Sequence, residues 1–379
     1  MTPAQETLAW LERLGFFGIH LGLERMHALL EQFHHPERRF RSLHVVGTNG
    51  KTSVSRMAEA LLLAEGMSVG TYTSPHVTDW PERIRVNGAD IRDFVGAVER
   101  VRPAAEEVGA SQFEVLTVAA LVAFAEAGVD VAVVEAGLGG RLDATNVVGA
   151  EVVVLTNVAL EHVEHLGRSR EEIAREKLAV VHPGAAVVLT EPEWEGLARE
   201  RGATRVLVVS PANVAVAHAA AQELLGRPLD ARAADDVFVP GRLEERGERP
   251  LEIWDGAHNT AGVAYLLTRL PRRDWVLVLS ILADKDAERM LAAFSPLGRR
   301  LVATTSGYSR ALAPDELARR ARPFFQRIEV VVDPLEARAR GREAAGHDGA
   351  LLVSGSLYLV AALAAVRRAD VAWDGSANV

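Results

Sequence analysis

The sequence predicts an α/β protein with a P-loop, doubly wound, mostly parallel sheet domain and a smaller C-terminal Rossmann-like α/β domain. Two observations support this fold class. Short apolar segments alternate with helical segments along nearly the whole chain, a pattern typical of parallel strands joined by helices. A glycine-rich turn, residues 47–53, joins the first apolar strand to a helix and has the form of a phosphate-binding loop.

Composition limits the possible classes of function. The chain has 379 residues, which is enough for two or three domains with separate cores. It contains no cysteine, which excludes disulfides, Cys-zinc sites and thiol nucleophiles. No apolar run is long enough to cross a bilayer and no signal-peptide pattern is present, so we expect a cytoplasmic protein without membrane contact. The net charge of −9 argues against a general nucleic-acid binder.

Lysine is rare in a chain that is otherwise rich in positive charge. Lys and Arg together number 42, yet the only lysines are Lys51, Lys177 and Lys285. Arginine cannot serve as a compact point charge or form a carbamate or Schiff base at its terminal nitrogen. Each lysine also lies within a motif, so we predict functional roles for them. The alternative is that three lysines remain by chance at surface positions.

The first segments of the chain are predicted to be helices leading into the phosphate loop. Residues 1–42 carry apolar side chains at helical spacing, and the loop 15–22 either reaches a ligand or simply connects two helices. In the loop that follows, Lys51 would supply a point charge, and Thr52 or Ser53 a hydroxyl for Mg²⁺. Val45 stands where the usual motif has its first glycine, so an ordinary turn with a surface lysine is the alternative.

Donor side chains stand at or just beyond the ends of three predicted strands. The strand 68–73 leads into Ser74, the strand 129–135 ends on Glu135, and His162 follows the strand 152–157 by one loop. The carboxyl ends of parallel strands form the ligand side of a doubly wound sheet, and Mg²⁺ prefers oxygen ligands. We therefore predict a metal site at this edge. The alternatives are a helix or turn cap for Ser74, a salt-bridged strand end for Glu135 and a capped or satisfied side chain for His162.

The remaining pattern divides the chain into two domains. A charge-dense break around residues 235–250 separates a domain at 1–243 from a second one at 250–379. Further helices of the first domain are expected at 91–109, 113–127, 170–177 and 213–225, and further strands at 186–190 and 205–209. In the second domain, strands at 251–254, 275–280, 300–304, 328–332 and 350–353 alternate with helices beginning near residues 260, 286, 314, 334 and 356.

Several motifs together resemble a known enzyme family. Residues 47–52 and 255–259 resemble the Mur ligase superfamily. Others narrow the resemblance, over nearly the whole chain, to folylpolyglutamate synthase/dihydrofolate synthase. They are 73–76, 82–84, Phe113-Glu114 with Thr117, the highly specific 135–146, 282–286 and 354–358.

The resemblance implies an ATP-dependent amide ligase that adds L-glutamate to dihydropteroate, to the γ-carboxylate of reduced folates, or to both, through an acyl phosphate. It implies two Mg²⁺ ions held by Ser74, Glu135, His162 and a carbamylated Lys177. Lys51, Lys177 and His258 are the implied catalytic residues. ATP contacts map onto Thr48, Asn49, Gly50, Lys51, Thr52, Ser53, Asn213, Arg242, Asp255 and His258, and pteroate contacts onto Arg83, Ser111, Phe113, Arg141, Leu142, Asp143 and Ala144.

Departures from the family pattern and competing functions stay open at this stage. Thr52 stands where most folate members have Gly, Glu161 replaces the usual Asp, and the stretch 189–213 is short. One rival function is a Mur-type amino-acid ligase acting on a cell-wall nucleotide precursor. Another is a non-catalytic ATP-binding regulator, which would have little use for Lys177. We expect small-molecule partners only and a monomer.

Overall fold

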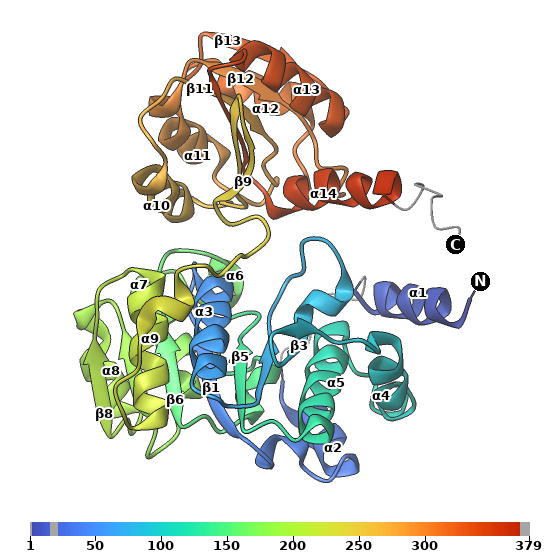
Figure 1. Ribbon diagram of the computed structural model, residues 1–379, viewed down its shortest axis with the longest axis vertical. Helices are drawn as coiled ribbons and strands as arrows, with labels where there is room; N and C mark the ends of the chain where they lie inside the picture. The colour runs from blue at the N-terminus through green and yellow to red at the C-terminus, as the bar shows by residue number, and fades with distance from the viewer. Residues whose placement is uncertain (1, 16–21, 372–379) are drawn as a thin grey trace. The chain divides into compact units, whose positions relative to one another are not determined.

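The computed structural model describes residues 2–15 and 22–371, which belong to two compact units, Met1–Val237 and Phe238–Val379 (Figure 1). Each unit contains one mostly parallel sheet covered by helices, as the sequence predicts. Residues 16–21 of the predicted loop 15–22 lie outside the described residues.

The sheet of the first unit has eight strands in the order β4-β3-β2-β5-β1-β6-β7-β8. All neighbouring pairs from β2 to β8 are parallel, and the two strands at the other edge are antiparallel. β1 lies at the centre and is buried on both faces, which explains its continuous apolar pattern. The strands are β1 (Arg41–Val46), β2 (Val69–Tyr72), β3 (Ile84–Val86), β4 (Ala89–Asp90), β5 (Val131–Glu135), β6 (Val152–Leu155), β7 (Ala186–Leu189) and β8 (Arg205–Val208).

Helices cover both faces of this sheet and form two separate cores. α3 and α9 lie side by side on one face (Figure 1), where Leu43 and Val45 of β1 pack against them. On the other face, α1, α2, α4 and α5 pack around Val46 and its neighbours. The helices are α1 (Pro3–Gly15), α2 (Glu24–Gln32), α3 (Lys51–Ala64), α4 (Phe94–Val108), α5 (Gln112–Ala127), α6 (Val163–Leu166), α7 (Arg170–Lys177), α8 (Glu195–Glu200) and α9 (Asn213–Leu225).

The second unit has a six-stranded sheet in the order β13-β12-β11-β14-β10-β9, parallel except for β9. Strands and helices alternate from β10 onward at the predicted positions. The strands are β9 (Glu244–Glu248), β10 (Leu251–Trp254), β11 (Trp275–Leu279), β12 (Arg300–Ala303), β13 (Arg327–Val330) and β14 (Ala350–Ser354). The helices are α10 (Thr260–Arg269), α11 (Ala287–Phe294), α12 (Pro314–Ala321), α13 (Pro334–Ala345) and α14 (Leu357–Val371).

Sequence reasoning missed the antiparallel strands at two sheet edges. β9 lies inside the charge-dense segment 235–250, which the sequence predicts to be a domain boundary, and it pairs with β10. Four of its five residues are charged, so it lacks the apolar alternation by which a strand is recognised. The β3–β4 hairpin was also missed, because β4 has only two residues. Edge strands are often short or charged, because these features discourage pairing with another chain.

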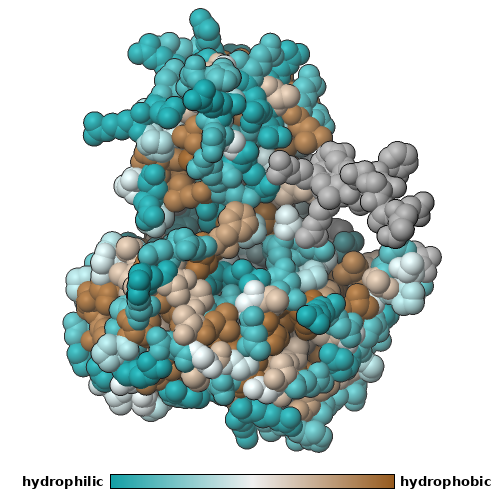
Figure 2. All heavy atoms as spheres, viewed as in Figure 1, coloured by the Kyte–Doolittle hydropathy of each residue, from teal (hydrophilic) through white to brown (hydrophobic). Residues whose placement is uncertain are grey.

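The surface is mostly hydrophilic on the face shown in Figure 2, where hydrophobic residues form small separate groups on each unit. Within residues 2–15 and 22–371, no helix is long and apolar enough to span a membrane.

Candidate active site

The turn after β1 is a narrow glycine loop leading into α3. Gly47 has φ +144°, and a Cβ placed on it would lie 1.8 Å from Thr156 Oγ1. Gly50 has φ +83° and precedes the first residue of α3, and a Cβ there would lie 2.8 Å from Asn213 Oδ1. Both positions therefore require glycine. Asn213, which was predicted to contact ATP, begins α9 beside this loop.

Polar contacts fix the shape of this loop. Thr48 Oγ1 accepts a hydrogen bond from Ala159 N at 3.0 Å, and Asn49 N donates to Asn157 Oδ1 at 3.0 Å. Lys51 Nζ turns back over the loop, at 3.3 Å from Gly47 O and 3.4 Å from Thr48 O. The loop thus places a flexible ammonium group at the start of α3, where an anion is stabilised by the helix N-terminus. The other predicted contact in this turn, Ser53, is buried.

Glu135 brings two of the predicted metal-binding segments together. It is 1% exposed at the end of β5, which pairs with β1 on one side and β2 on the other. Its Oε1 accepts a hydrogen bond from Thr52 Oγ1 at 3.0 Å, and its Oε2 accepts one from Ser74 N at 3.1 Å. The register of three parallel strands thus gathers a carboxylate and two hydroxyl-bearing residues beside the glycine loop.

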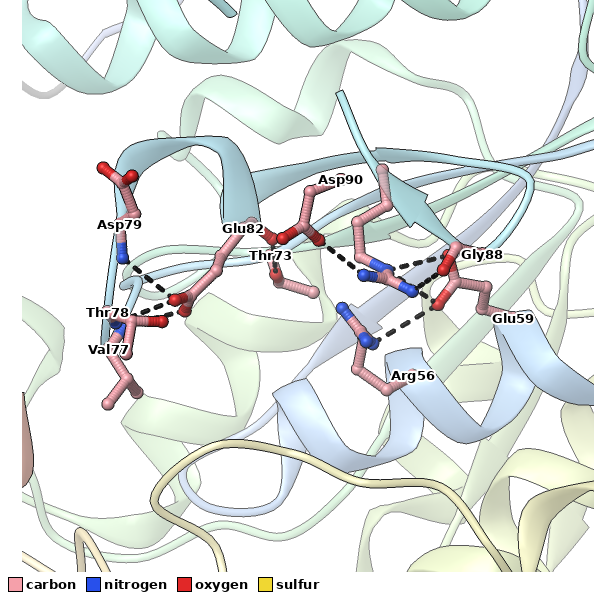
Figure 3. A network of polar contacts seen from close by, with 10 residues as sticks. Arg56, Glu59, Thr73, Val77, Thr78, Asp79, Glu82, Gly88 and Asp90 are labelled. Atoms are coloured by element: carbon pink, nitrogen blue, oxygen red, sulfur yellow. Dashed lines mark hydrogen bonds and ion pairs between the residues drawn. The ribbon is translucent and has the colours of Figure 1, made fainter. Parts of the chain in front are cut away.

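The loop after Ser74 is held from within by Glu82, as Figure 3 shows. The Glu82 carboxylate accepts hydrogen bonds from the backbone N–H groups of residues 77–79, at 2.8–2.9 Å. Thr73 Oγ1 donates to Glu82 O at 3.4 Å. The motifs 73–76 and 82–84 form the two ends of one loop, and these hydrogen bonds join them. This explains why the two motifs occur together.

The side chains of Arg83 and Arg85, just after Glu82, contact different groups. Buried Arg83 donates through Nε to His76 Nδ1 at 2.9 Å and lies 5.1 Å from the centre of the Trp80 ring. Arg85 pairs with Glu59 of α3 at 3.1 Å and also with Asp90, and so ties the β3–β4 hairpin to that helix. The second network lies beside the first in Figure 3.

Lys177, at the end of α7, also reaches the glycine loop. It is 4% exposed, and its Nζ donates to Gly47 O at 2.8 Å. Burial, and then the nearby Lys51 ammonium, lower the pKa of Lys177 to about 7. Gly140 packs closely against this region, since a Cβ on it would lie 2.6 Å from Lys177 O. The glycine-rich segment after β5 is therefore required for the approach of Lys177.

Asp143 holds together the predicted pteroate loop. Its buried carboxylate accepts hydrogen bonds from Leu138 N at 2.7 Å, from Thr145 N at 3.0 Å and from the Thr145 hydroxyl. Burial raises the pKa of Asp143. The loop continues through half-buried Leu142 and buried Ala144, which starts the 3₁₀ helix η3 (Ala144–Val147).

Three other predicted substrate residues flank this loop. Arg141 is exposed, and its Nε lies 2.9 Å from Glu176 Oε2. The ring of Phe113 packs 5.9 Å from that of Tyr72 and against Gly137. Ser111 caps α5, since its hydroxyl accepts a hydrogen bond from the backbone N–H of the third helical residue.

His162 is the predicted metal ligand that follows β6. It precedes α6 with φ 48°, and its Nε2 lies 3.6 Å from Glu161 Oε1. Among the side chains that the structure describes, up to residue 365, no three or more of His, Cys, Asp and Glu form a metal-binding cluster. The predicted ligand set has only two such residues, Glu135 and His162. Its remaining members are Ser74 and Lys177.

The predicted nucleotide residues of the second unit lie close to one another. Asp255 follows β10, and its carboxylate accepts hydrogen bonds from Leu243 N at 2.9 Å and Ala257 N at 2.8 Å. Burial raises the pKa of Asp255, while the Arg242 guanidinium opposes that rise. His258 Nδ1 lies 2.9 Å from Gly256 O.

Comparison with known proteins identifies the family. Residues 45–224 match the Mur ligase middle domain, and residues 241–357 match the Mur ligase, glutamate ligase domain. The dihydrofolate synthase/folylpolyglutamate synthase of Mycobacterium tuberculosis is 34% identical, over 78% of this chain and 76% of that one. The chain belongs to the dihydrofolate synthase/folylpolyglutamate synthase family.

Solved structures of this family share the fold of the whole chain. Escherichia coli FolC in complex with DHPP and ADP has a TM-score of 0.88 and 29% identity, with 96% of this chain and 98% of that one covered. A bifunctional folylpolyglutamate synthase/dihydrofolate synthase of Yersinia pestis, complexed with AMPPNP and Mn ion, has a TM-score of 0.87 and 29% identity, covering 97% and 98%. Members of this dihydrofolate synthase/folylpolyglutamate synthase family are ATP-dependent Mur-type ligases, and the folate assignment is favoured over a cell-wall ligase.

Some features of the site were not predicted from the sequence. The contact of Thr52 with Glu135 and the approach of Thr156 to Gly47 join segments more than 80 residues apart. The negative charge of Glu161 acts to raise the pKa of Lys177, against the larger effect of burial. In the sequence, Glu161 stood out only as a departure from the family pattern.

Proposed function

We propose that this chain joins L-glutamate to dihydropteroate, to reduced folates, or to both, at the expense of ATP. The observation that carries the proposal is the gathering of Thr52, Glu135, Ser74 and Lys177 around the glycine loop. These groups come from four segments, and a phosphate loop used only for binding does not require all of them.

The glycine loop and Lys51 would bind the triphosphate. The backbone from Gly47 to Gly50 has the narrow form that lets N–H groups approach phosphate oxygens. Lys51 Nζ, which now contacts carbonyl oxygens, would move to the transferring phosphoryl group. Catalysis of phosphoryl transfer depends mainly on such positioning and charge neutralisation.

The residues present fit Mg²⁺ by their chemistry. The Glu135 carboxylate, the hydroxyls of Thr52 and Ser74, and His162 would hold it, and a carbamate on Lys177 would add an anionic oxygen ligand. Bound Mg²⁺ would neutralise charge on the phosphate oxygens. A second ion and the carbamate are part of this proposal. The carbamate forms when the neutral Lys177 amine adds to CO₂, making an N–C bond and releasing one proton.

The proposed reaction has two steps. A carboxylate oxygen of the folate substrate attacks the γ-phosphorus of ATP, which forms an acyl phosphate and releases ADP. The glutamate amine then attacks the acyl carbon, forming the amide and releasing phosphate and a proton. The closely packed loop 137–145 would hold the pteroate portion, with Phe113 beside it and with Arg83, Ser111 and Arg141 at its edges.

The second unit would contribute the remaining nucleotide contacts. Arg242, Asp255 and His258 form one group within that unit, and the glutamate ligase domain match covers all three. We propose that they bind ATP, with Asn213 contributing from the first unit. A monomeric state and a cytoplasmic location remain predictions.

Mass spectrometry of reaction products tests this function. Mg-ATP and glutamate are supplied with dihydropteroate, a tetrahydrofolate or a cell-wall nucleotide precursor in parallel. We expect a mass increase of one glutamyl group, together with ADP, in at least one folate reaction. Product from the cell-wall precursor alone, or ATP binding without ADP release in every arm, would contradict the proposal.

A further inference from the structure

A second pocket lies in the first unit at the opposite end of β1 from the glycine loop. It has a volume of about 330 Å³ and is bounded by α2, the 3₁₀ helix η1 (Pro36–Arg38), the start of β1 and the segment 147–151. Small-molecule sites begin at roughly 300 Å³. From Ser42 in its wall to Gly47, the chain rises by roughly 16 Å, at about 3.3 Å per residue. The pocket is therefore separate from the proposed ATP site.

Glu37, in the wall of this pocket, carries a buried oxygen with unmet hydrogen-bonding capacity. The residue is 7% exposed, and its Oε1 lies 3.0 Å from His35 Nδ1 and 3.3 Å from Arg38 Nε. Its Oε2 has no hydrogen-bond partner in the part of the chain that the structure describes. Among the carboxylates whose side chains the structure describes, up to residue 365, Glu37 is alone in having such a buried oxygen. Buried polar atoms are rarely left in this state, so it calls for a donor from outside the chain.

A second such atom lies in the same wall. Ser42 is 3% exposed, and its Oγ also has no hydrogen-bond partner within the described residues. The neighbouring Arg41 is already engaged, since it pairs with Glu151 at 2.8 Å and with Leu224 O. One small pocket thus contains two buried polar atoms without a partner. The Glu37 carboxylate can only accept a hydrogen bond when it is ionised, whereas the Ser42 hydroxyl can donate or accept one.

The apolar part of the wall favours an aromatic ligand. Leu30, Phe40, Val147 and Val148 line the pocket with apolar surface. A flat ring would cover these side chains, while an attached amino group would donate to Glu37. We propose that this pocket binds an amino-substituted aromatic heterocycle, the chemistry shared by purine bases and pterins.

One short element joins this pocket to the predicted pteroate loop. η3 begins at Ala144 in that loop and ends at Val147 in the pocket wall. Thr145, between them, is held by the Asp143 carboxylate and by His44 Nε2 of β1 at 2.8 Å. A ligand against Val147 therefore contacts the short helix that begins at Ala144 and is capped by Asp143. Its occupancy should change the KM for the folate substrate more than that for ATP, and this part of the inference rests on the proposed function.

Ligand-observed NMR with the full chain tests the binding directly. The probes are 2-aminopyrimidine, adenine and pterin, and pyrimidine, which lacks the amino group, is the matched control. We expect 2-aminopyrimidine to bind at least about tenfold more tightly than pyrimidine, the ratio of one good hydrogen bond. Comparison of adenine with pterin shows whether the pocket prefers a purine base or a pterin. AMPPNP is added to block the nucleotide site. Displacement of 2-aminopyrimidine by AMPPNP would overturn the proposal. The absence of binding at millimolar concentration would also overturn it and would leave water as the partner of Glu37 Oε2.

Two variants locate the binding, and kinetics test the connection. Glu37→Gln removes the charge, Val147→Phe fills the pocket, and each should weaken the probe by at least about tenfold. Glu126→Gln, an exposed residue paired with Arg100, is the control. Unchanged probe affinity in both variants would overturn the site. With the probe saturating, a folate KM that shifts no more than the ATP KM would overturn the connection through η3. Binding in a protein that makes no glutamyl product would instead refute the proposed function and keep the pocket.

Discussion

The two ends of β1 handle buried polar groups in different ways. At the carboxyl end, Glu135 and Lys177 both have partners supplied by the chain, at 2.8–3.1 Å. At the amino end, Glu37 Oε2 and Ser42 Oγ have no hydrogen-bond partner among the described residues. Ligands at the carboxyl end must therefore exchange with existing contacts, whereas a ligand at the amino end needs only to add one. We infer that substitutions at the carboxyl end mainly affect catalysis, and that the amino end tolerates change with little effect on the chemical step.

The largest effect is expected from Lys177→Arg. Arginine keeps a positive charge but cannot become a carbamate, and the buried position offers little room for a guanidinium. We expect kcat for ligation to fall by roughly 10³-fold, the scale of losing a key charged group in a site. ATP affinity, measured by equilibrium binding, should change little. Arg175→Lys, the reverse change on an exposed part of α7, should leave kcat unaltered. Full, bicarbonate-independent activity in Lys177→Arg would refute the role of this lysine.

Glu135→Gln should have the next largest effect. The amide keeps the size of the side chain and an acceptor for the Ser74 N–H, but loses the negative charge. We expect roughly a 10²-fold loss of kcat and a higher Mg²⁺ requirement. Activity measured across a Mg²⁺ titration checks this, with Glu126→Gln as the charge-matched control. An unchanged Mg²⁺ dependence would show that Glu135 does not hold the metal.

Glycine-to-alanine substitutions near the two ends of β1 should change the stability of the folded protein by different amounts. Gly47→Ala would place a Cβ 1.8 Å from Thr156 Oγ1 at φ +144°, and we expect roughly 2–4 kcal/mol of destabilisation. Gly149, near the amino end, has φ +51° with open space around its Cβ, so Gly149→Ala should cost only about 1 kcal/mol. Denaturant midpoints of the two variants measure the difference. Equal midpoints would contradict the crowding at Gly47.

The last effect, which depends on pH, concerns His44 in the middle of β1. Burial, and then His182, lower the pKa of His44 to about 3, below its ordinary value of 6.5. Between these pH values the unfolded chain binds a proton that the folded chain does not, so stability falls as pH decreases from 6.5. His44→Asn should remove up to about 1.4 kcal/mol per pH unit from this decline. Denaturation between pH 6.5 and 4.5 measures the slope, and an identical slope in the variant would contradict a neutral, buried His44.

Much of the fold could be predicted because its parallel strands are continuous apolar runs separated by helices. The alternation from Leu251 to Ser354 gave every strand of the second unit except β9, whose charged residues hide it. The phosphate loop was recognisable because Gly47 and Gly50 serve backbone conformations that other residues rarely adopt. The family resemblance then extended the prediction to the remaining motifs.

The candidate site was less predictable in its contacts than in its members. Ser74 and Glu135 could be placed at strand ends, but the bond between Thr52 and Glu135 depends on the register of β1 and β5. The pocket near Glu37 gave no signal at all, because a carboxylate in a short charged segment usually lies on the surface. Its burial depends on packing between elements that are distant in sequence.

The positions of the lysines have a practical consequence for chemical labelling. Lys177 is buried, Lys51 is half-buried over the glycine loop, and Lys285 lies 3.5 Å from Asp284 with its side chain 11% exposed. The cations on the exterior are thus almost all guanidinium groups, which amine-reactive reagents leave unmodified. Apart from the α-amino group, such a reagent would therefore report mainly on Lys51. A lower labelling rate of the Lys51 amine in the presence of nucleotide would therefore report directly on binding at the phosphate loop, with little background from other side chains.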